Sequence, residues 1–141
     1  GKLGVSNSVL DKAGKLDDDE WAAVKLHAEY TETILSRIRA FAELAQVAAS
    51  HHERLDGRGY PRGLKGEEIS LETRIITTAD IFDAITADRP YRGPIPIPRA
   101  LEMMTETVGT AIDAQCLDAL KQALERMSHM SITPQFAAAA A

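Results

Sequence analysis

Two adjacent histidines, His51 and His52, are the clearest candidates for chemistry in this chain of 141 residues. A third histidine, His27, also falls at a predicted helix end, and Asp80 lies inside a later helix. Imidazole nitrogens together with a carboxylate suit divalent iron, manganese or zinc. A lone histidine is more often structural or solvated, but an adjacent pair is less ordinary. The four residues therefore predict a metal site.

The position of the histidine pair also suggests how the two rings would be used. The apolar spacing before them predicts a helix that runs directly into His51 and His52. Successive side chains on a helix diverge by about 100°, so we do not expect these two to chelate one ion together. Each could instead serve one of two ions about 3.5–4 Å apart, with a carboxylate bridging them.

A pair of carboxylates, Asp80 and Asp83, shares one face of the helix predicted over residues 71–87. The apolar residues of this helix are Ile75, Ile76, Ala79, Ile81, Phe82, Ala84 and Ile85. Because they surround nearly its whole circumference, we expect the helix to be largely buried. A buried ionised carboxylate needs a metal, a cation or several donors. The alternative to a metal site is a salt bridge with Arg74 or Arg89.

Residues 55–66 contain four glycines and one proline, which predicts a rigid loop. Glycine permits positive φ and close backbone approach, while proline stiffens the turn. Within this loop Tyr60 could pack as an aromatic floor or stack on a base. We expect Arg58, Arg62 and Lys65 to be exposed cations.

Two further arginines, Arg89 and Arg92, follow the helix that carries Asp80. Guanidinium groups bind phosphate through two parallel hydrogen bonds, so a phosphate clamp is one interpretation. The other is that these arginines interact with the carbonyls at the helix C-terminus. The residues themselves leave both interpretations open.

The elements that must position these residues are predicted to be helices. Asp17 to Glu20 form an acidic first turn, typical of a helix N-terminus. Apolar helical spacing follows from Trp21 to Ala28, from Ile34 to Ile38 and from Phe41 to Ala48. Ser70 is expected to cap the helix over 71–87, and further helices are predicted near 98–107 and 113–128. With no alternating strand pattern, the fold class is all-α, a helical bundle. The tail over 129–141 is low in complexity.

Composition limits the class of protein. The apolar content is 45%, which is in the globular range, and the net charge is −5 without a basic stripe, so a nucleic-acid polymer is not expected as a partner. The single cysteine, Cys116, excludes an internal disulfide and is expected in the core. No apolar run reaches the roughly 18 residues of a membrane helix, and the start has no signal-peptide pattern. We expect a cytoplasmic protein without membrane contact from this segment.

The segment HHERLDGRGYPRGLKGEEISLETRIITTADIFDAITADRPYR, residues 51–92, resembles the HD-GYP family almost continuously. The segments GKLGV and SVLDKAGKL resemble it too, so the HD-GYP domain is expected over residues 1–128. This resemblance implies an all-helical, metal-dependent phosphodiesterase that converts cyclic di-GMP to pGpG or GMP in bacterial second-messenger signalling. Its cofactor would be a bi- or trinuclear iron or manganese centre.

The resemblance also implies roles for individual residues. It makes His27, His51, His52 and Asp80 metal ligands. Lys2 matches the lysine that closes the HDxGK motif and faces the scissile phosphate, so it would be catalytic. The substrate-binding residues would be Tyr60, Arg89 and Arg92.

One departure from the family pattern opens alternatives. The chain starts at Gly1-Lys2, so the His-Asp dyad expected just before Gly1 is not part of it. We therefore expect the C-terminal part of such a domain, in which a two-metal centre would be incomplete and whose exposed apolar faces would favour self-association as a homo-oligomer. One alternative is a non-catalytic module whose loop docks a partner such as a GGDEF-type diguanylate cyclase domain. Another is a phosphohydrolase for a different cyclic dinucleotide.

Overall fold

The longest helix of the molecule begins at the run of four acidic residues. The computed structural model describes residue 2, residues 4–88 and residues 93–129. Helix α2, Asp18–Ser36, has Asp17 as its N-cap. The Asp17 carboxylate accepts the N–H of Glu20, and the Glu20 side chain accepts the N–H of Asp17, both at 2.9 Å. This reciprocal capping box satisfies two backbone donors and confirms the predicted start of the helix.

The described residues form helices and loops, with two isolated bridges and no strand. The remaining elements are α1 (Asn7–Leu10), η1 (Arg39–Phe41), α3 (Ala42–Ala49), η2 (Gly66–Glu68), α4 (Leu71–Thr86), α5 (Ile97–Thr105) and α6 (Ala114–His129). The all-α prediction is confirmed, and the second and third helical patterns prove to be the end of α2 and α3. Arg89, Arg92 and residues 130–141 of the predicted tail lie outside the described residues.

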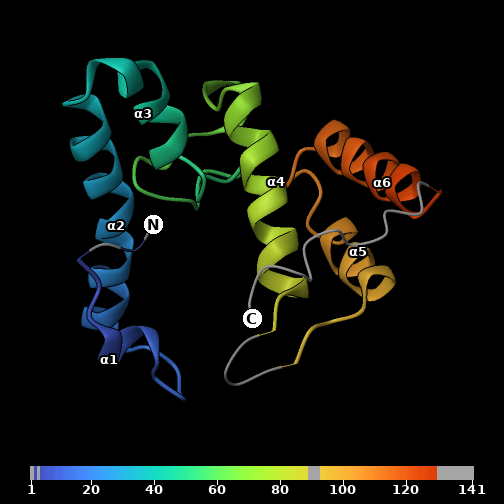
Figure 1. Cartoon of the computed structure of the whole chain (residues 1–141), viewed down its shortest axis with the longest axis horizontal. Helices are drawn as coiled ribbons and strands as arrows, with labels where there is room; N and C mark the ends of the chain where they lie inside the picture. Colours follow the sequence, from blue (N-terminus) through green and yellow to red (C-terminus); the bar gives the residue numbers. More distant parts are fainter. Residues whose placement is uncertain (1, 3, 89–92, 130–141) are drawn as a thin grey trace, which may run out of the picture.

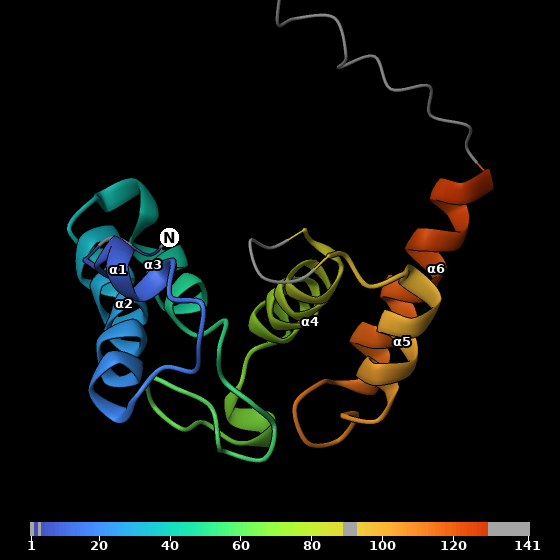
Figure 2. The same ribbon diagram turned by 90° about the horizontal axis from the view of Figure 1, so that it is seen from below.

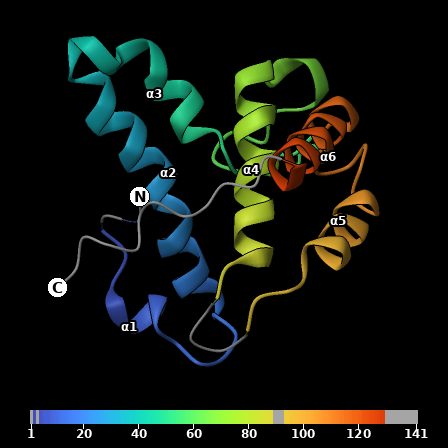
Figure 3. The same cartoon turned by 45° about the vertical axis from the view of Figure 1, so that its right-hand side comes forward.

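Three groups of helices lie side by side. Helices α2 and α3 form one group, α4 stands in the middle, and α5 and α6 form the other group (Figures 1 and 2). Helices α2 and α3 run in opposite directions, joined by a turn at one end (Figure 3). The loop between α3 and α4 therefore connects the first group to the central helix. This is the loop that carries the histidine pair at its start.

The largest apolar cluster lies between α4, α5 and α6. Its buried members are Met104, Ala111, Ile112 and Leu117. Ile81, Phe82 and Ile85 of α4 pack against it, so this face of α4 is held by the C-terminal helices. Cys116 is buried beside the cluster, as predicted.

The prediction that α4 is buried on nearly all sides is wrong. Ile75 is 52% exposed and Ile76 is 41% exposed, while Asp80 and Asp83 are also exposed. The buried positions of α4 are instead Thr73, Thr77 and Thr78. Within the described part of the chain, α4 contacts other helices on only part of its circumference. A threonine can line the covered part because its hydroxyl donates to a carbonyl, as Thr78 does to Arg74.

Arg74 does not form the predicted alternative salt bridge with Asp80 or Asp83. Its guanidinium instead contacts Asp113, with Nη1 and Oδ2 3.3 Å apart. Asp113 also accepts the N–H groups of Gln115 and Cys116, at the start of α6. The pKa of Asp113 lies below its ordinary value: burial acts to raise it, but these backbone donors and Arg74 together outweigh that effect.

We expect Asp113→Asn to lower the free energy of unfolding by about 1–2 kcal/mol at pH 7, because hydrogen bonds to a charged group are lost. A carboxylate whose folded pKa is depressed stabilises the fold above its unfolded pKa and loses that effect as pH falls through the folded pKa. The difference in unfolding free energy between variant and wild type should therefore shrink as the pH falls below 3.8, the ordinary pKa of an aspartate. Urea unfolding at several pH values tests this, with exposed Asp118→Asn on the same helix as control. A deficit that stays constant down to low pH would contradict it.

Candidate metal and phosphate site

The three candidate histidines come from two different elements. His27 is buried in the middle of α2. The predicted helix before the pair ends at Ala49, with Ser50 as its C-cap, so His51 and His52 lie in the turn that follows and not on the helix. The expectation of a helical 100° divergence between them is therefore wrong.

The turn brings all three rings together. The centroids of the His51 and His52 rings are 4.0 Å apart, and those of His27 and His52 are 5.0 Å apart. Nε2 of His52 lies 3.2 Å from Nε2 of His27. One nitrogen from each of the three histidines lies within 4.8 Å of the others. The geometry thus gathers the three residues, which we call the histidine cluster, around one point.

Backbone carbonyls orient two of the rings. Nδ1 of His27 lies 2.5 Å from the Val24 oxygen, and Nδ1 of His51 lies 2.7 Å from the Ala48 oxygen. A carbonyl only accepts, so each Nδ1 carries the proton and each Nε2 presents a lone pair. This hydrogen bond at the second ring nitrogen is the usual way in which proteins orient metal-ligating histidines. Thr77 of α4 also donates to the His51 carbonyl, at 3.0 Å.

Burial keeps two members of the cluster neutral. It lowers the pKa of His52 to about 3, with further lowering from the neighbouring His51 and His27. Burial also lowers the pKa of His27, although the bond to Val24 acts in the opposite direction. A histidine must be neutral to ligate a metal. Both residues are therefore in the required state at neutral pH without any metal to displace their protons.

Two nitrogens of the cluster are spaced as they would be around one divalent ion. With metal–nitrogen bonds of about 2.0–2.1 Å, two nitrogens at the tetrahedral angle stand about 3.3–3.4 Å apart. The separation of 3.2 Å between the Nε2 atoms of His27 and His52 is close to that value. Nitrogen donors of this kind suit iron, manganese and zinc, so the donor set agrees with the metals expected from the sequence.

A cavity of about 620 Å³ lies against the cluster, and its lining includes Lys2, Asp80 and Asp83. Asp80 projects from α4 beside His52, with Oδ2 3.9 Å from Nδ1. It is not within the compact group of three histidines. The structure therefore brings Lys2 and Asp80 to the same cavity as the cluster.

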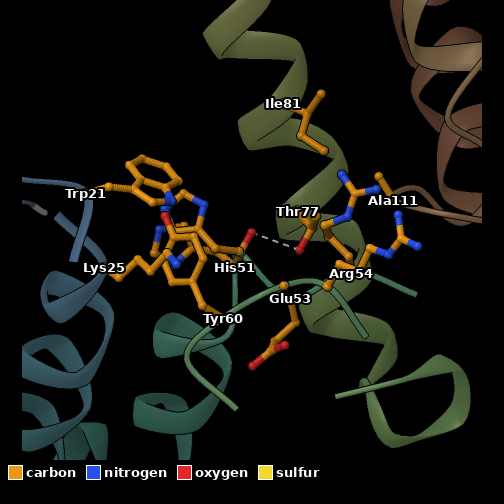
Figure 4. A pocket seen from close by; sticks show the side chains of 12 residues that line it. Trp21, Lys25, His51, Glu53, Arg54, Tyr60, Thr77, Ile81 and Ala111 are labelled. Carbon is orange, nitrogen blue, oxygen red and sulfur yellow. Dashed lines mark hydrogen bonds between the residues drawn. The ribbon is translucent and has the colours of Figure 1, made fainter. Parts of the chain in front are cut away.

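Tyr60 lies on the other side of His52. The two rings are stacked, with centroids 4.6 Å apart and an interplanar angle of 29°. Burial, together with the charge of Asp80, raises the pKa of Tyr60 to about 12, so the phenol stays protonated. Trp21 of α2 meets Tyr60 edge to face, with centroids 6.1 Å apart (Figure 4). Tyr60 is thus directed toward the histidines, as an aromatic floor would be.

Glu53, which directly follows the pair, is 1% exposed and fixes the glycine-rich loop. One of its carboxylate oxygens accepts the N–H of Arg62 at 2.7 Å, and the other accepts the N–H of Leu64 at 2.9 Å. The Arg62 side chain is not free, as it forms an ion pair with Glu32 and donates to Ser50. The loop is therefore attached to the backbone that carries His51 and His52.

Glu53→Gln should lower the free energy of unfolding by about 2 kcal/mol, because the amide nitrogen would face one backbone N–H that then lacks an acceptor. Glu43→Gln, on an exposed position of α3, is the matched control. Urea unfolding followed by circular dichroism measures both. If the two variants unfold alike, Glu53 does not hold the loop in the way described.

Sequence reasoning assigned no role to Glu53 or Trp21. Trp21 continues an apolar helical spacing with Val24 and Ala28, both buried, yet it is 44% exposed beside Tyr60. The position of Glu53, an acid immediately after two candidate ligands, is the one signal that could have drawn attention to it. Lys25 also lies beside the Trp21 ring, with its ammonium 5.6 Å from the ring centroid.

Comparisons with known proteins identify the family of the chain. A family model described as HD domain matches residues 1–116. A 3'3'-cGAMP-specific phosphodiesterase 3 of Vibrio cholerae is 63% identical over 124 residues, covering 88% of this chain and 27% of the relative. The cyclic di-GMP phosphodiesterase response regulator RpfG of Xanthomonas campestris is 40% identical and covers all of this chain and 37% of the relative. The chain thus spans about a quarter to a third of the length of these relatives.

A crystal structure of a cyclic GMP-AMP specific phosphodiesterase of V. cholerae is 54% identical. The match covers 89% of this chain and 27% of the chain in the crystal structure. The TM-score of this match is 0.45. No helix of the described residues combines the length and apolar character needed to cross a membrane.

Proposed function

Since the chain belongs to the HD-domain family, in its HD-GYP branch, we propose that it carries active-site residues of a metal-dependent phosphodiesterase for cyclic dinucleotides. The observation that carries this proposal is the histidine cluster, His27, His51 and His52, with its nitrogens within 4.8 Å of one another. The activities in the names of the relatives support the substrate class.

The histidine cluster would hold iron or manganese. A divalent ion held there supplies positive charge for phosphate oxygens and lowers the pKa of a bound water. The chain's own contribution is to present Nε2 of His27 and His51 with fixed orientation, through the bonds to Val24 and Ala48. Burial lowers the pKa of His27 and of His52, which keeps protons from competing for the site.

Other residues would act on the substrate. Lys2 lines the cavity next to the cluster, where its ammonium can stabilise charge that develops on a phosphate. Asp80, whose Oδ2 lies 3.9 Å from Nδ1 of His52, would complete the ligand set or orient the ring. Tyr60, stacked on His52, would contact the substrate at the edge of the site. Arg89 and Arg92 remain proposed phosphate ligands on the strength of the sequence resemblance.

Two substrates are candidates within the class. Cyclic di-GMP, cleaved to pGpG or GMP, is the substrate predicted from the sequence, and a relative 40% identical carries that activity in its name. 3'3'-cGAMP is the second candidate, because the relative 63% identical is named as specific for it. Both contain two phosphodiester bonds between nucleotides, so the same metal chemistry applies to either.

The experiment is to incubate the whole protein that contains this chain with each dinucleotide. It should be prepared without oxygen and supplied with manganese or ferrous iron, and products should be separated by chromatography. We expect linear dinucleotide or mononucleotide products from at least one substrate, and none after chelation of the metal. If the metal-replete protein cleaves neither dinucleotide, the proposal is contradicted.

A further inference from the structure

A second cavity, of about 540 Å³, lies on the Tyr60 side of the histidine cluster. Its lining includes Trp21, Lys25, Arg54, Arg58 and Tyr60. His51 and His52 line both this cavity and the one that contains Lys2 and Asp80. A ligand whose phosphate lies at the cluster can therefore extend into the second cavity, which has the size of a typical small-molecule site.

One wall of this cavity is aromatic. Trp21 and Tyr60 meet edge to face at the cavity, and Trp21 is 44% exposed although it belongs to the apolar stripe of α2 (Figure 4). Exposed aromatic rings that line a pocket are suited to stacking on a nucleobase, which has an aromatic face whatever its identity. Ile81 and Ala111 contribute apolar surface across the cavity (Figure 4).

The cations of the cavity are not equally engaged. The Arg54 guanidinium is held by the Asp56 carboxylate through two bonds, of 3.1 and 2.9 Å. Lys25 contacts the Trp21 ring, and the Arg58 backbone N–H donates to Asp56. Neither the Lys25 ammonium nor the Arg58 guanidinium forms an ion pair with any described residue. The Arg58 guanidinium acts on the Asp56 carboxylate through its charge and makes no hydrogen bond to it, so both side chains keep their N–H donors available in the same cavity as the aromatic wall.

We propose that this cavity, which we call the base pocket, binds one base of the cyclic dinucleotide and that Lys25 and Arg58 make it prefer guanine. The inference rests on the proposed function. Guanine presents two acceptors, N7 and O6, on one edge, whereas adenine presents one acceptor and the N6 amino donor. Lysine and arginine are donors only, so they satisfy the guanine edge and leave the adenine amino group facing another donor.

The preference has a consequence for the choice of substrate. Cyclic di-GMP contains two guanines and 3'3'-cGAMP contains one, so each can place a guanine in the base pocket. Cyclic di-AMP contains none. A single guanine-selective pocket therefore admits both candidate substrates and disfavours the third cyclic dinucleotide, without any need to read the second base.

Equilibrium dialysis with GMP and AMP tests the base pocket without turnover. The whole, metal-loaded protein should bind GMP at least about tenfold more tightly than AMP, as expected for one good donor pair to a guanine edge. Arg58→Ala and Lys25→Met should each reduce this ratio toward one. Trp21→Leu should weaken both nucleotides by about tenfold and leave their ratio unchanged, because stacking does not distinguish bases.

The matched controls are Arg39→Ala and Lys15→Met, which remove exposed cations that do not line the cavity. Metal content should be equal in all variants. Equal binding of GMP and AMP by the wild type would overturn the inference. The inference would also be overturned if Arg58→Ala and Lys25→Met weakened the binding of GMP and of AMP equally, since those cations would then bind only phosphate. Dialysis needs no catalysis, so a failure here is distinct from an absence of hydrolysis, which would count against the proposed function.

Discussion

His52→Ala is expected to abolish metal-dependent hydrolysis and to weaken metal binding by more than about a hundredfold, beyond the 10–100-fold typical of losing an outer-shell partner. His52 has the central position in the cluster: its Nε2 lies 3.2 Å from that of His27, and its ring is 4.0 Å from that of His51. Removing it leaves two nitrogens and opens the site to water. Metal content after dialysis, measured by mass spectrometry, and turnover of both dinucleotides check this.

The control for this variant is His129→Ala, which removes the chain's fourth histidine, at the end of α6. It should retain wild-type metal content and activity. A second check is stability. His52 is largely enclosed and Tyr60 stacks on it, so unfolding should be measured in the absence of metal to separate a folding defect from a lost ligand. If His52→Ala retains the wild-type metal content after dialysis, the histidine cluster is not the metal site.

Gly59→Ala is expected to lower the free energy of unfolding by about 3 kcal/mol, the upper end of the usual cost of overpacking. A Cβ at Gly59 would lie 2.5 Å from the Arg54 nitrogen and the Glu53 Cα, and 2.6 Å from the His52 oxygen. All three are backbone atoms, which cannot rotate away as a side chain could. The loop must therefore move off the segment that carries His52, which should also weaken metal binding.

Gly14→Ala is the matched control, because a Cβ there meets no heavy atom within 4 Å. Its unfolding free energy should stay within about 0.5 kcal/mol of wild type, as for most surface changes. Denaturant titrations of both variants, with and without manganese, give stability and metal linkage together. If Gly59→Ala is as stable as Gly14→Ala, the glycine-rich loop does not pack closely against the backbone of His52, Glu53 and Arg54.

The helices could be predicted from the sequence because their starts depend on local chemistry. Asp17 and Ser70 cap α2 and α4 with their own side chains, at the expected positions. The surroundings of α4 could not be predicted, because apolar periodicity reports how a helix could be buried and not which neighbours it has. Ile75 and Ile76 are exposed for that reason, and threonines are buried by donating hydroxyls to carbonyls.

The composition of the site was more predictable than its geometry. Residue type identified the histidines as candidate ligands, and the structure places all three together. Their arrangement depends on α3 ending at Ala49, two to three residues before the predicted boundary at His51 and His52. That small shift places His51 and His52 in a turn, so that their rings converge. Glu53 and Trp21 act through contacts with residues distant in sequence, which no local pattern records.

X-ray absorption spectroscopy of the whole protein loaded with manganese tests most directly whether the histidine cluster is the metal site. The histidine cluster predicts scattering from three imidazole rings around the ion, and loss of one ring in a metal-saturated sample of His52→Ala. A spectrum with oxygen ligands alone, unchanged by that substitution, would contradict the account.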